Sequence, residues 1–277
     1  MFWAMRSLLL LTTACVLAGA AVIYEDPTQV TSFKVNEPLN LKIVRDHLKF
    51  HHVQGELPAN TFSKLPKFTY LQIKGNITYI EPGAFHGLHH LIQLDLHDNG
   101  IRYLINGTFR GATNLRFLNL GSNDIRYIEP HAFHNVRELE NLNLNYNYNL
   151  KVLRDNAFFG LTHLKVLSLI DCGLREIQRS AFYSLEQLES LDLSRNNFKE
   201  ISGDYFVDLI KLNDLNLSHN KLTWLDPRTF QGKLLALRKL NIMHNDMRCD
   251  VAHEIERQMA ATVKVAVRTE AGYGCII

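Results

Sequence analysis

Thirteen histidines and four cysteines are the residues of this 277-residue chain with the most specific chemistry. The closest histidine groups are His51-His52, His89-His90 and His131-x-x-His134, and no carboxylate or cysteine completes a set of metal ligands. The chain contains no glycine-rich phosphate loop, no G-x-S-x-G turn and no C-x-x-C pair. Because no nucleophile, base and orienting group can be assembled from these motifs, we expect a binding protein without catalytic residues, metal or cofactor.

Composition limits the class of protein and of partner. Hydrophobic residues make up 46% of the chain and charged residues 21%, a balance that argues against disorder. The formal net charge of +2 gives no global electrostatic reason to expect nucleic acid or an acidic membrane as partner. Four cysteines are too few to frame a disulfide-rich miniprotein, although their even number leaves two disulfides open.

The N-terminus has the pattern of a secretory signal peptide. Arg6 supplies a positive charge, residues 7–17 form an apolar run, and residues 18–20 (Ala-Gly-Ala) are small, as a signal peptidase prefers. The alternative interpretation is a buried N-terminal helix or strand. No later segment approaches the roughly 20 apolar residues of a membrane span. We therefore expect a signal peptide over residues 1–20 and a secreted, extracellular protein.

Leucines recur with a nearly constant period along most of the chain. The segment Leu91-x-x-Leu94-x-Leu96-x-x-Asn99 is the clearest copy, and the start-to-start spacing of the copies is 24 or 25 residues. The other copies begin at Leu115, Leu139, Leu164, Leu188, Leu212 and Leu237. Two divergent 23-residue copies precede them, from near Arg45 and Phe68. This pattern is the signature of the leucine-rich repeat.

The repeat pattern predicts the fold. The Leu-x-Leu alternation places leucines on one face of a short strand, and a single repeat cannot bury that face alone. We therefore expect an α/β repeat solenoid, a right-handed horseshoe with a parallel concave β-sheet and capped ends. A phenylalanine recurs in the second half of each repeat, and its spacing indicates one stacked core column rather than a cofactor site: Phe62, Phe85, Phe109, Phe133, Phe158, Phe182, Phe206 and Phe230.

A column of asparagines should close the turn that follows each concave strand. These side chains are expected to point inward and bond the backbone of the turn, whose buried polar groups would otherwise be unpaired: Asn99, Asn123, Asn147, Asn196, Asn220 and Asn245. Cys172 occupies this column in its repeat. We interpret it as a buried, unpaired structural thiol; a reactive or intermolecular cysteine is the alternative.

The two ends of an open solenoid need caps. Residues 21–44, which alternate apolar and polar side chains, are expected to form an N-terminal cap as a strand or hairpin. The repeats then span residues 45–247, about nine in number. In the C-terminal cap, residues 248–277, Asp250 could N-cap a helix that buries Val251, Ile255 and Met259, and a strand is expected over 263–267.

The outer segments 82–85 (Pro-Gly-Ala-Phe) and 130–133 (Pro-His-Ala-Phe) resemble extracellular repeats of Toll-type receptors and the secreted leucine-rich immune proteins of mosquitoes and other insects. The C-terminal region resembles the cysteine-flanked cap of extracellular leucine-rich repeat proteins, which implies a Cys249–Cys275 disulfide. Members of the insect group commonly add a cysteine-rich segment and a coiled coil for dimerisation. This sequence shows neither, so a homodimer has no support from it.

Two surfaces are candidates for partner binding. On the concave face, exposed apolar side chains on a polar sheet are informative, although scattered surface hydrophobes are the plainer interpretation. The candidates there are the apolar Tyr70, Phe117, Tyr146, Val166 and Ile170, and Asp95, Asn119, Asn143 and Asp192 from a central polar column. A basic edge with neighbouring tyrosines lies beyond the turn, where a solvated flank is the plainer interpretation: Arg102, Arg126, Lys151, Arg175 and Lys199.

Three N-x-[ST] sequons agree with a secreted glycoprotein. Asn106 lies on an expected outer turn, and Asn216 on the concave face, where a glycan would direct partners toward the N-terminal half. Asn76 lies in or beside the buried asparagine column, where a glycan would not fit.

Fold alone does not give function, so the functional expectation rests on the resemblance. We expect an extracellular protein or glycan ligand, and a role in innate immunity through pathogen recognition or capture of complement-like factors. The alternatives are a matrix or adhesion protein, a secreted decoy of a repeat receptor, or an enzyme inhibitor.

Overall fold

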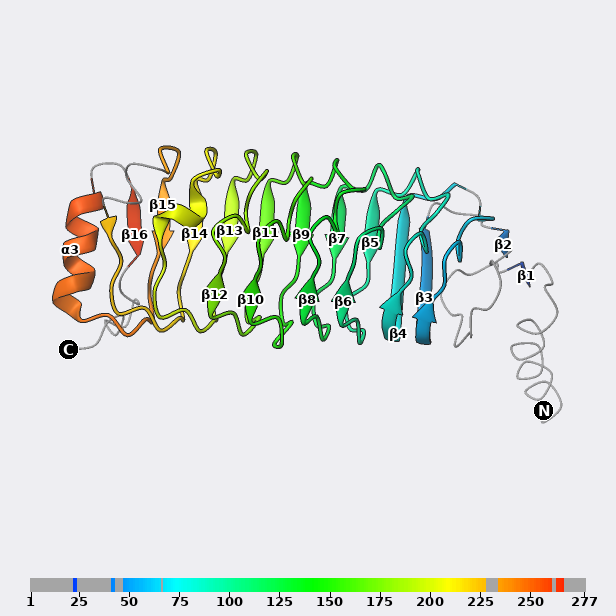
Figure 1. Cartoon of the computed structure of the whole chain (residues 1–277), viewed down its shortest axis with the longest axis horizontal. Helices are drawn as coiled ribbons and strands as arrows, with labels where there is room; N and C mark the ends of the chain where they lie inside the picture. The colour runs from blue at the N-terminus through cyan, green and yellow to red at the C-terminus, as the bar shows by residue number, and fades with distance from the viewer. Residues whose placement is uncertain are drawn as a thin grey trace, which may run out of the picture.

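The computed structural model describes residues 47–65, 67–227, 234–260 and 263–266, together with the backbone of two short strands at 22–23 and 41–42. The chain winds as a solenoid whose successive turns contribute strands to one ten-stranded sheet (Figure 1). Neighbouring strands are parallel throughout, which confirms the predicted repeat solenoid. In sheet order the strands are β3 (His47–Leu57), β4 (Tyr70–Ile80), β5 (Gln93–Asp95), β7 (Phe117–Asn119), β9 (Asn141–Asn143), β11 (Val166–Ser168), β13 (Ser190–Asp192), β14 (Asp214–Asn216), β15 (Lys239–Asn241) and β16 (Lys264–Ala266).

Shorter elements complete the turns of the solenoid. Beyond the turn after the main strand, β6 (Tyr103–Leu104) pairs with β8 (Tyr127–Ile128), and β10 (Val152–Leu153) with β12 (Glu176–Ile177). A 3-10 helix, η1 (Gly203–Phe206), lies in one outer segment. These pairs set consecutive repeats in register on a second flank, which aligns the predicted basic edge.

The predicted phenylalanine column is part of the core, in which it lies among buried leucines and isoleucines. The seven members from Phe62 to Phe206 that the structure describes are at most 1% exposed. Consecutive rings of this column lie 5.5–6.1 Å apart between centroids, with nearly parallel planes. Phe230 lies outside the described residues. Because each ring contacts the one above and the one below, burial is complete only when neighbouring repeats stack.

The C-terminal end is covered by α3 (Cys249–Met259), which lies at one end of the row of strands in Figure 1. The helix begins two residues earlier than expected, after Arg248, so the prediction that Asp250 caps it is wrong. Asp250 lies in the first turn and accepts hydrogen bonds at 3.1 Å from the Arg248 guanidinium, a position where its charge still favours the helix. Ile255 and Met259 are buried as predicted, and β16 extends the sheet beside β15.

The N-terminal cap is described only in part. Backbone strands β1 (Val22–Ile23) and β2 (Leu41–Lys42) pair in parallel, which is not the antiparallel pairing of a hairpin. The rest of residues 21–44 lies outside the described residues, as do the proposed signal peptide and Cys275. The Cys249–Cys275 disulfide stays a prediction.

Asparagine side chains close each buried turn as predicted. At Asn123, Nδ2 donates to the carbonyls of Leu96 and Leu120 at 3.0 Å, and Oδ1 accepts from the backbone N–H of Ile101 at 3.1 Å. The same pattern recurs at Asn99, Asn147, Asn196, Asn220 and Asn245. Each side chain therefore bonds its own turn and the turn of the preceding repeat.

Cys172 stands where the other repeats have one of these asparagines. Its thiol can replace the donor of the asparagine side chain but not the acceptor. Its thiol donates to the Leu144 carbonyl at 3.2 Å, but sulfur is a weak acceptor for the preceding turn. In the other repeats an asparagine Oδ1 accepts from one backbone N–H of the preceding turn. The corresponding N–H here is that of Leu150, and it donates instead to the carbonyl of Asn147 at 3.0 Å. This local bond exists because the preceding turn contains one extra residue between Asn147 and Leu150. The 25-residue repeat and the cysteine thus compensate for each other.

Gly173 makes room for this irregular turn. Its φ is +68°, and a Cβ atom there would lie 2.4 Å from the Tyr148 carbonyl oxygen. Only glycine avoids this overlap without moving backbone. The enlarged turn carries Tyr148 outward, with 55% of the residue exposed.

Replacing Asn196 with alanine should destabilise the protein by about 2–4 kcal/mol, because buried N–H and C=O groups lose their partners. Its Oδ1 accepts from the backbone of both Cys172 and Leu174 at 3.0 Å. Urea denaturation measures the change in the free energy of unfolding. Asn197→Ala, a change at the adjacent half-buried position, is the control. An equal effect of both changes would exclude a special role for the column.

Cys172 should be unreactive in the folded protein. It is buried, and this burial raises the pKa of its thiol to about 12, so the thiol stays protonated at pH 8. We expect no labelling by iodoacetamide at pH 8 and rapid labelling once urea unfolds the chain. Cys172→Ser identifies the signal. Labelling of Cys172 at the rate of a free thiol in the native protein would contradict the structural assignment.

Candidate functional site

The face of the ten-stranded sheet carries two columns of outward side chains that the strand register aligns. Tyr70, Gln93 and Phe117 are paired positions of β4, β5 and β7, and the same column continues through Asn141 and Val166. Two residues further along each strand lies the central polar column: Gln72, Asp95, Asn119, Asn143, Ser168, Asp192, Asn216 and Asn241.

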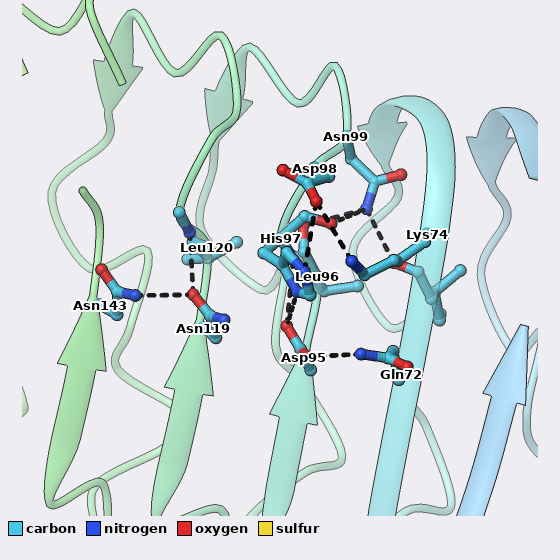
Figure 2. Close-up of polar contacts among 12 residues, drawn as sticks. Gln72, Lys74, Asp95, Leu96, His97, Asp98, Asn99, Asn119, Leu120 and Asn143 are labelled. Carbon is cyan, nitrogen blue, oxygen red and sulfur yellow. Dashed lines mark hydrogen bonds and ion pairs between the residues drawn. The ribbon is translucent and has the colours of Figure 1, made fainter. Parts of the chain in front are cut away.

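The central polar column uses part of its hydrogen-bonding capacity inside the molecule (Figure 2). Three of its contacts bridge neighbouring strands: Gln72 Nε2 to Asp95 Oδ2 at 2.8 Å, Asn143 Nδ2 to Asn119 Oδ1 at 2.9 Å, and Asn216 Nδ2 to Asp192 Oδ2 at 3.0 Å. The carboxylate and amide oxygens also accept the backbone N–H two residues on, as at Asp192 and Ser194. These contacts fix the side chains before any partner arrives, which lowers the entropy cost of binding to them.

A polar network extends from this column at β5. The Asp95 carboxylate accepts from His97 Nδ1 at 2.6 Å, and His97 Nε2 lies 3.3 Å from an oxygen of Asp98, which also pairs with Lys74 at 3.1 Å (Figure 2). The imidazole therefore bridges two carboxylates. The repeat pattern does not connect His97 with Asp95, because the contact depends on the turn after the strand.

Three of the five predicted apolar candidates are exposed on or beside this face. Phe117 is 41% exposed, Val166 37% and Tyr146 43%, whereas Tyr70 and Ile170 are half-buried. Phe117 and Val166 stand in one column two strands apart, about 10 Å at the usual strand spacing. Exposed apolar side chains at this spacing can contact one partner together.

Tyr148 is a surface residue that the repeat pattern did not predict. Its ring centroid lies 6.4 Å from that of Tyr146, and both rings are exposed. The signal that could have found it is the extra residue in the 25-residue repeat, because an insertion in a solenoid turn must project outward.

Tyr70, at the N-terminal end of the column, is held by its neighbours. Its ring lies 5.2 Å from the ring of His47, and Lys49 Nζ lies 5.7 Å from its centroid. Burial raises the pKa of the Tyr70 phenol, and the nearby Asp95 carboxylate adds to this effect. Tyr70 therefore stays neutral in any physiological compartment.

The basic edge is aligned as predicted, and a carboxylate neutralises part of it. Asp124 lies 2.7 Å from Arg126 Nη2 and 3.5 Å from Arg102 Nε. Lys151 Nζ donates to the Tyr148 carbonyl at 2.5 Å. Arg175 and Lys199 are exposed, and among the described residues no carboxylate pairs with either. This edge is therefore a mixed-charge flank at Arg102 and Arg126.

The three sequons differ in their surroundings. Asn106 is exposed on its outer turn, where its backbone N–H donates to Glu129. Asn216 is half-buried on the sheet face and bonded to Asp192. Asn76 lies in β4 with an exposed side chain, so it is outside the buried asparagine column. Glycan occupancy at all three stays a prediction.

Comparison with known proteins identifies the family. The leucine-rich repeat model matches residues 54–101, 93–148, 137–198 and 186–247, which together span more than half of the chain. The chain belongs to the leucine-rich repeat family. No curated protein sequence matched it.

Solved leucine-rich repeat structures resemble the chain in fold. The TLR13–ssRNA13 complex matches with TM-score 0.63 and 28% identity over 76% of this chain and 30% of the TLR13 chain. The leucine-rich repeat domain of APL1B matches with TM-score 0.58 and 20% identity, covering 90% and 70%. FLRT2, in an octameric complex with latrophilin 3 and Unc5D, matches with TM-score 0.59 and 23% identity, covering 83% and 79%. The chain thus spans under a third of the TLR13 chain.

Two further observations concern other kinds of site in this leucine-rich repeat protein. Within the described part of the chain, no three histidine, cysteine or carboxylate side chains are grouped so that they could hold a metal ion. None of its described helices has the length and apolar character to cross a bilayer.

The basic edge should respond to acid through Asp124. The hydrogen bond from Arg126, with help from Asn149, lowers the pKa of Asp124 below its ordinary value of 3.8. The folded state thus favours the charged form of Asp124. The carboxylate therefore stabilises the fold above pH about 4, and this contribution is lost as pH falls through the lowered pKa. Asp124→Asn should reduce the loss of stability between pH 5 and pH 2, measured by urea denaturation. The control Asp246→Asn, at an exposed carboxylate, should keep the wild-type pH dependence. Identical pH profiles for wild type and Asp124→Asn would contradict this role.

Proposed function

We propose that this leucine-rich repeat protein is a secreted, non-enzymatic binding protein that captures an extracellular protein on the sheet face, in innate immunity. The observation that carries the proposal is the exposed apolar set formed by Phe117 and Val166 on an otherwise polar sheet and by Tyr146 just beyond its strands. Burial in the monomer does not explain these side chains, whereas a partner that covers them would gain hydrophobic free energy.

The polar surroundings of this set suit a specific protein partner. Around Phe117 and Val166, the fixed amides of Asn119 and Asn143 offer oriented hydrogen-bonding groups. An apolar centre with a polar rim is the usual anatomy of a protein interface. A glycan on Asn216 would stand in the C-terminal half of the same face and direct partners to the N-terminal half.

Support for an immune role comes from the fold neighbours TLR13 and APL1B and from the resemblance of the outer segments to insect immune repeats. FLRT2, whose solved complex contains latrophilin 3 and Unc5D, supports the alternative of an adhesion or matrix protein. The ssRNA in the TLR13 complex is the ligand of that protein. The net charge of +2 of this chain gives no comparable reason to bind nucleic acid.

The double variant Phe117→Ala/Val166→Ala should weaken partner binding about tenfold or more, because truncated hot-spot residues leave the partner's apolar groups unpaired. Its melting temperature should stay near that of the wild type, since both side chains are already exposed. Val207→Ala/Leu235→Ala is the matched control: it removes two exposed apolar side chains that are not on the sheet strands.

The measurement is quantitative mass spectrometry of proteins captured from body fluid by wild type, variant and control. Proteins captured by wild type and control but lost by the variant identify the partner, and its titration against all three gives the affinities. Capture of complement-like factors, more strongly after infection, supports the immune role. A partner set of matrix components would replace that role with the adhesion alternative. Identical capture by all three proteins would remove the sheet face as the binding surface.

A further inference from the structure

A groove separate from the sheet face and from the basic edge opens on the flank where the chain enters the main strands. Its volume is about 870 Å³, and its lining comes from the segments that precede β4, β5, β7 and β9. Four consecutive repeats thus contribute to one hollow. No repeat position in the sequence marks it, because each repeat supplies a different side chain.

The charged side chains in the lining of the groove are mostly cationic. The lining contains three cations, Lys67, Arg116 and Arg137, and one carboxylate, Glu138. Arg116 is bound at 2.6 Å to Glu140, which it shares with Lys165 at 2.8 Å. Over the described parts of the chain, no carboxylate forms an ion pair with Lys67 or Arg137. Two exposed cations are therefore available to a ligand.

Arg137 is oriented without being neutralised. Its Nη2 lies 3.1 Å from Nε2 of His134, which also lines the groove. Guanidinium is a donor only, so His134 Nε2 is the acceptor in this contact. A neutral acceptor fixes one edge of the guanidinium and leaves the other N–H groups to a ligand anion. Arginine suits such paired contacts with sulfate or carboxylate oxygens.

The uncharged lining indicates which anion fits. Thr113 and Asn135 supply a hydroxyl and an amide, and Ile92 supplies an apolar surface that is 39% exposed. The one phenylalanine of the lining, Phe68, is only 2% exposed. Single-stranded nucleic acids bind mainly on exposed aromatic rings that stack with the bases, and the described residues of this lining offer no exposed Phe, Tyr or Trp ring, only the smaller imidazole of His90. A sugar chain needs hydroxyl partners and an apolar surface for its ring faces, and both are present.

We propose that this groove binds an acidic oligosaccharide. Its sulfate or carboxylate groups pair with Lys67 and Arg137, its hydroxyls bond Thr113 and Asn135, and a sugar ring lies on Ile92. The groove lining contains none of the residues assigned to protein capture. The proposal therefore stands or falls separately from the function proposed for the sheet face.

The test compares two double variants that remove the same charge from the full chain. Lys67→Gln/Arg137→Gln changes the groove, and Arg175→Gln/Lys199→Gln changes two exposed cations of the basic edge. Binding to a heparin hexasaccharide, a hexagalacturonate and neutral maltohexaose is measured by calorimetry at about 0.15 M salt, where diffuse attraction is screened. Thermal melting verifies that both variants fold.

We expect the wild type to bind one or both acidic probes and not the neutral one. The groove variant should lose about tenfold or more in affinity, because two charge-assisted contacts disappear, and the edge variant less than about threefold. Preference for the heparin fragment assigns sulfated chains, and preference for the galacturonate assigns carboxylated chains. The proposal is overturned by equal losses in both variants, by no binding to either acidic probe, or by tighter binding of a six-nucleotide single-stranded RNA at the groove.

Discussion

The structure depends on satisfying backbone polar groups in a turn that the fold buries. Each solenoid turn brings carbonyl and N–H groups into the apolar interior, where water cannot reach them. Asparagine meets this need because its amide donates and accepts at once, and its contacts span two repeats. Stacking and turn closure are therefore one requirement, since an isolated repeat would lack both its apolar neighbour and the partner of its turn.

Cys172 shows how strict this requirement is and how the fold changes when a weaker side chain meets it. A thiol donates but accepts poorly, so one N–H of the preceding turn needs another acceptor. The extra residue supplies a local turn that provides it, and Gly173 gives that turn the space it needs. The result at the surface is a pair of exposed tyrosines, Tyr146 and Tyr148. A substitution in the core thereby changes the surface beside the proposed binding face.

Periodicity explains which parts of the molecule could be predicted. The leucine period set the register of the strands, so the central polar column, the phenylalanine core and the aligned basic edge could be found by counting residues. The start of α3 was predicted two residues too late, because Asp250 is a residue type that favours the N-cap, whereas the helix begins after Arg248 and the Asp250 carboxylate bonds the Arg248 guanidinium. The sequence also placed Asn76 in or beside the buried asparagine column, but its side chain is exposed. The reason is that β4 continues as a strand through the position at which later repeats turn.

The groove lies beyond the reach of periodicity for a different reason. A column is one position repeated, whereas a hollow on a flank joins unlike positions from several repeats, such as Lys67 and Arg137. Charge on the two flanks also differs in kind. On the basic edge, Asp124 pairs with Arg102 and Arg126 and leaves Arg175 and Lys199 without a carboxylate partner among the described residues. In the groove, Arg137 likewise has no carboxylate partner, but the imidazole of His134 holds its guanidinium. Because a cation that a neighbouring side chain already orients loses less entropy when it binds an anion, the groove is the flank on which we expect an acidic ligand.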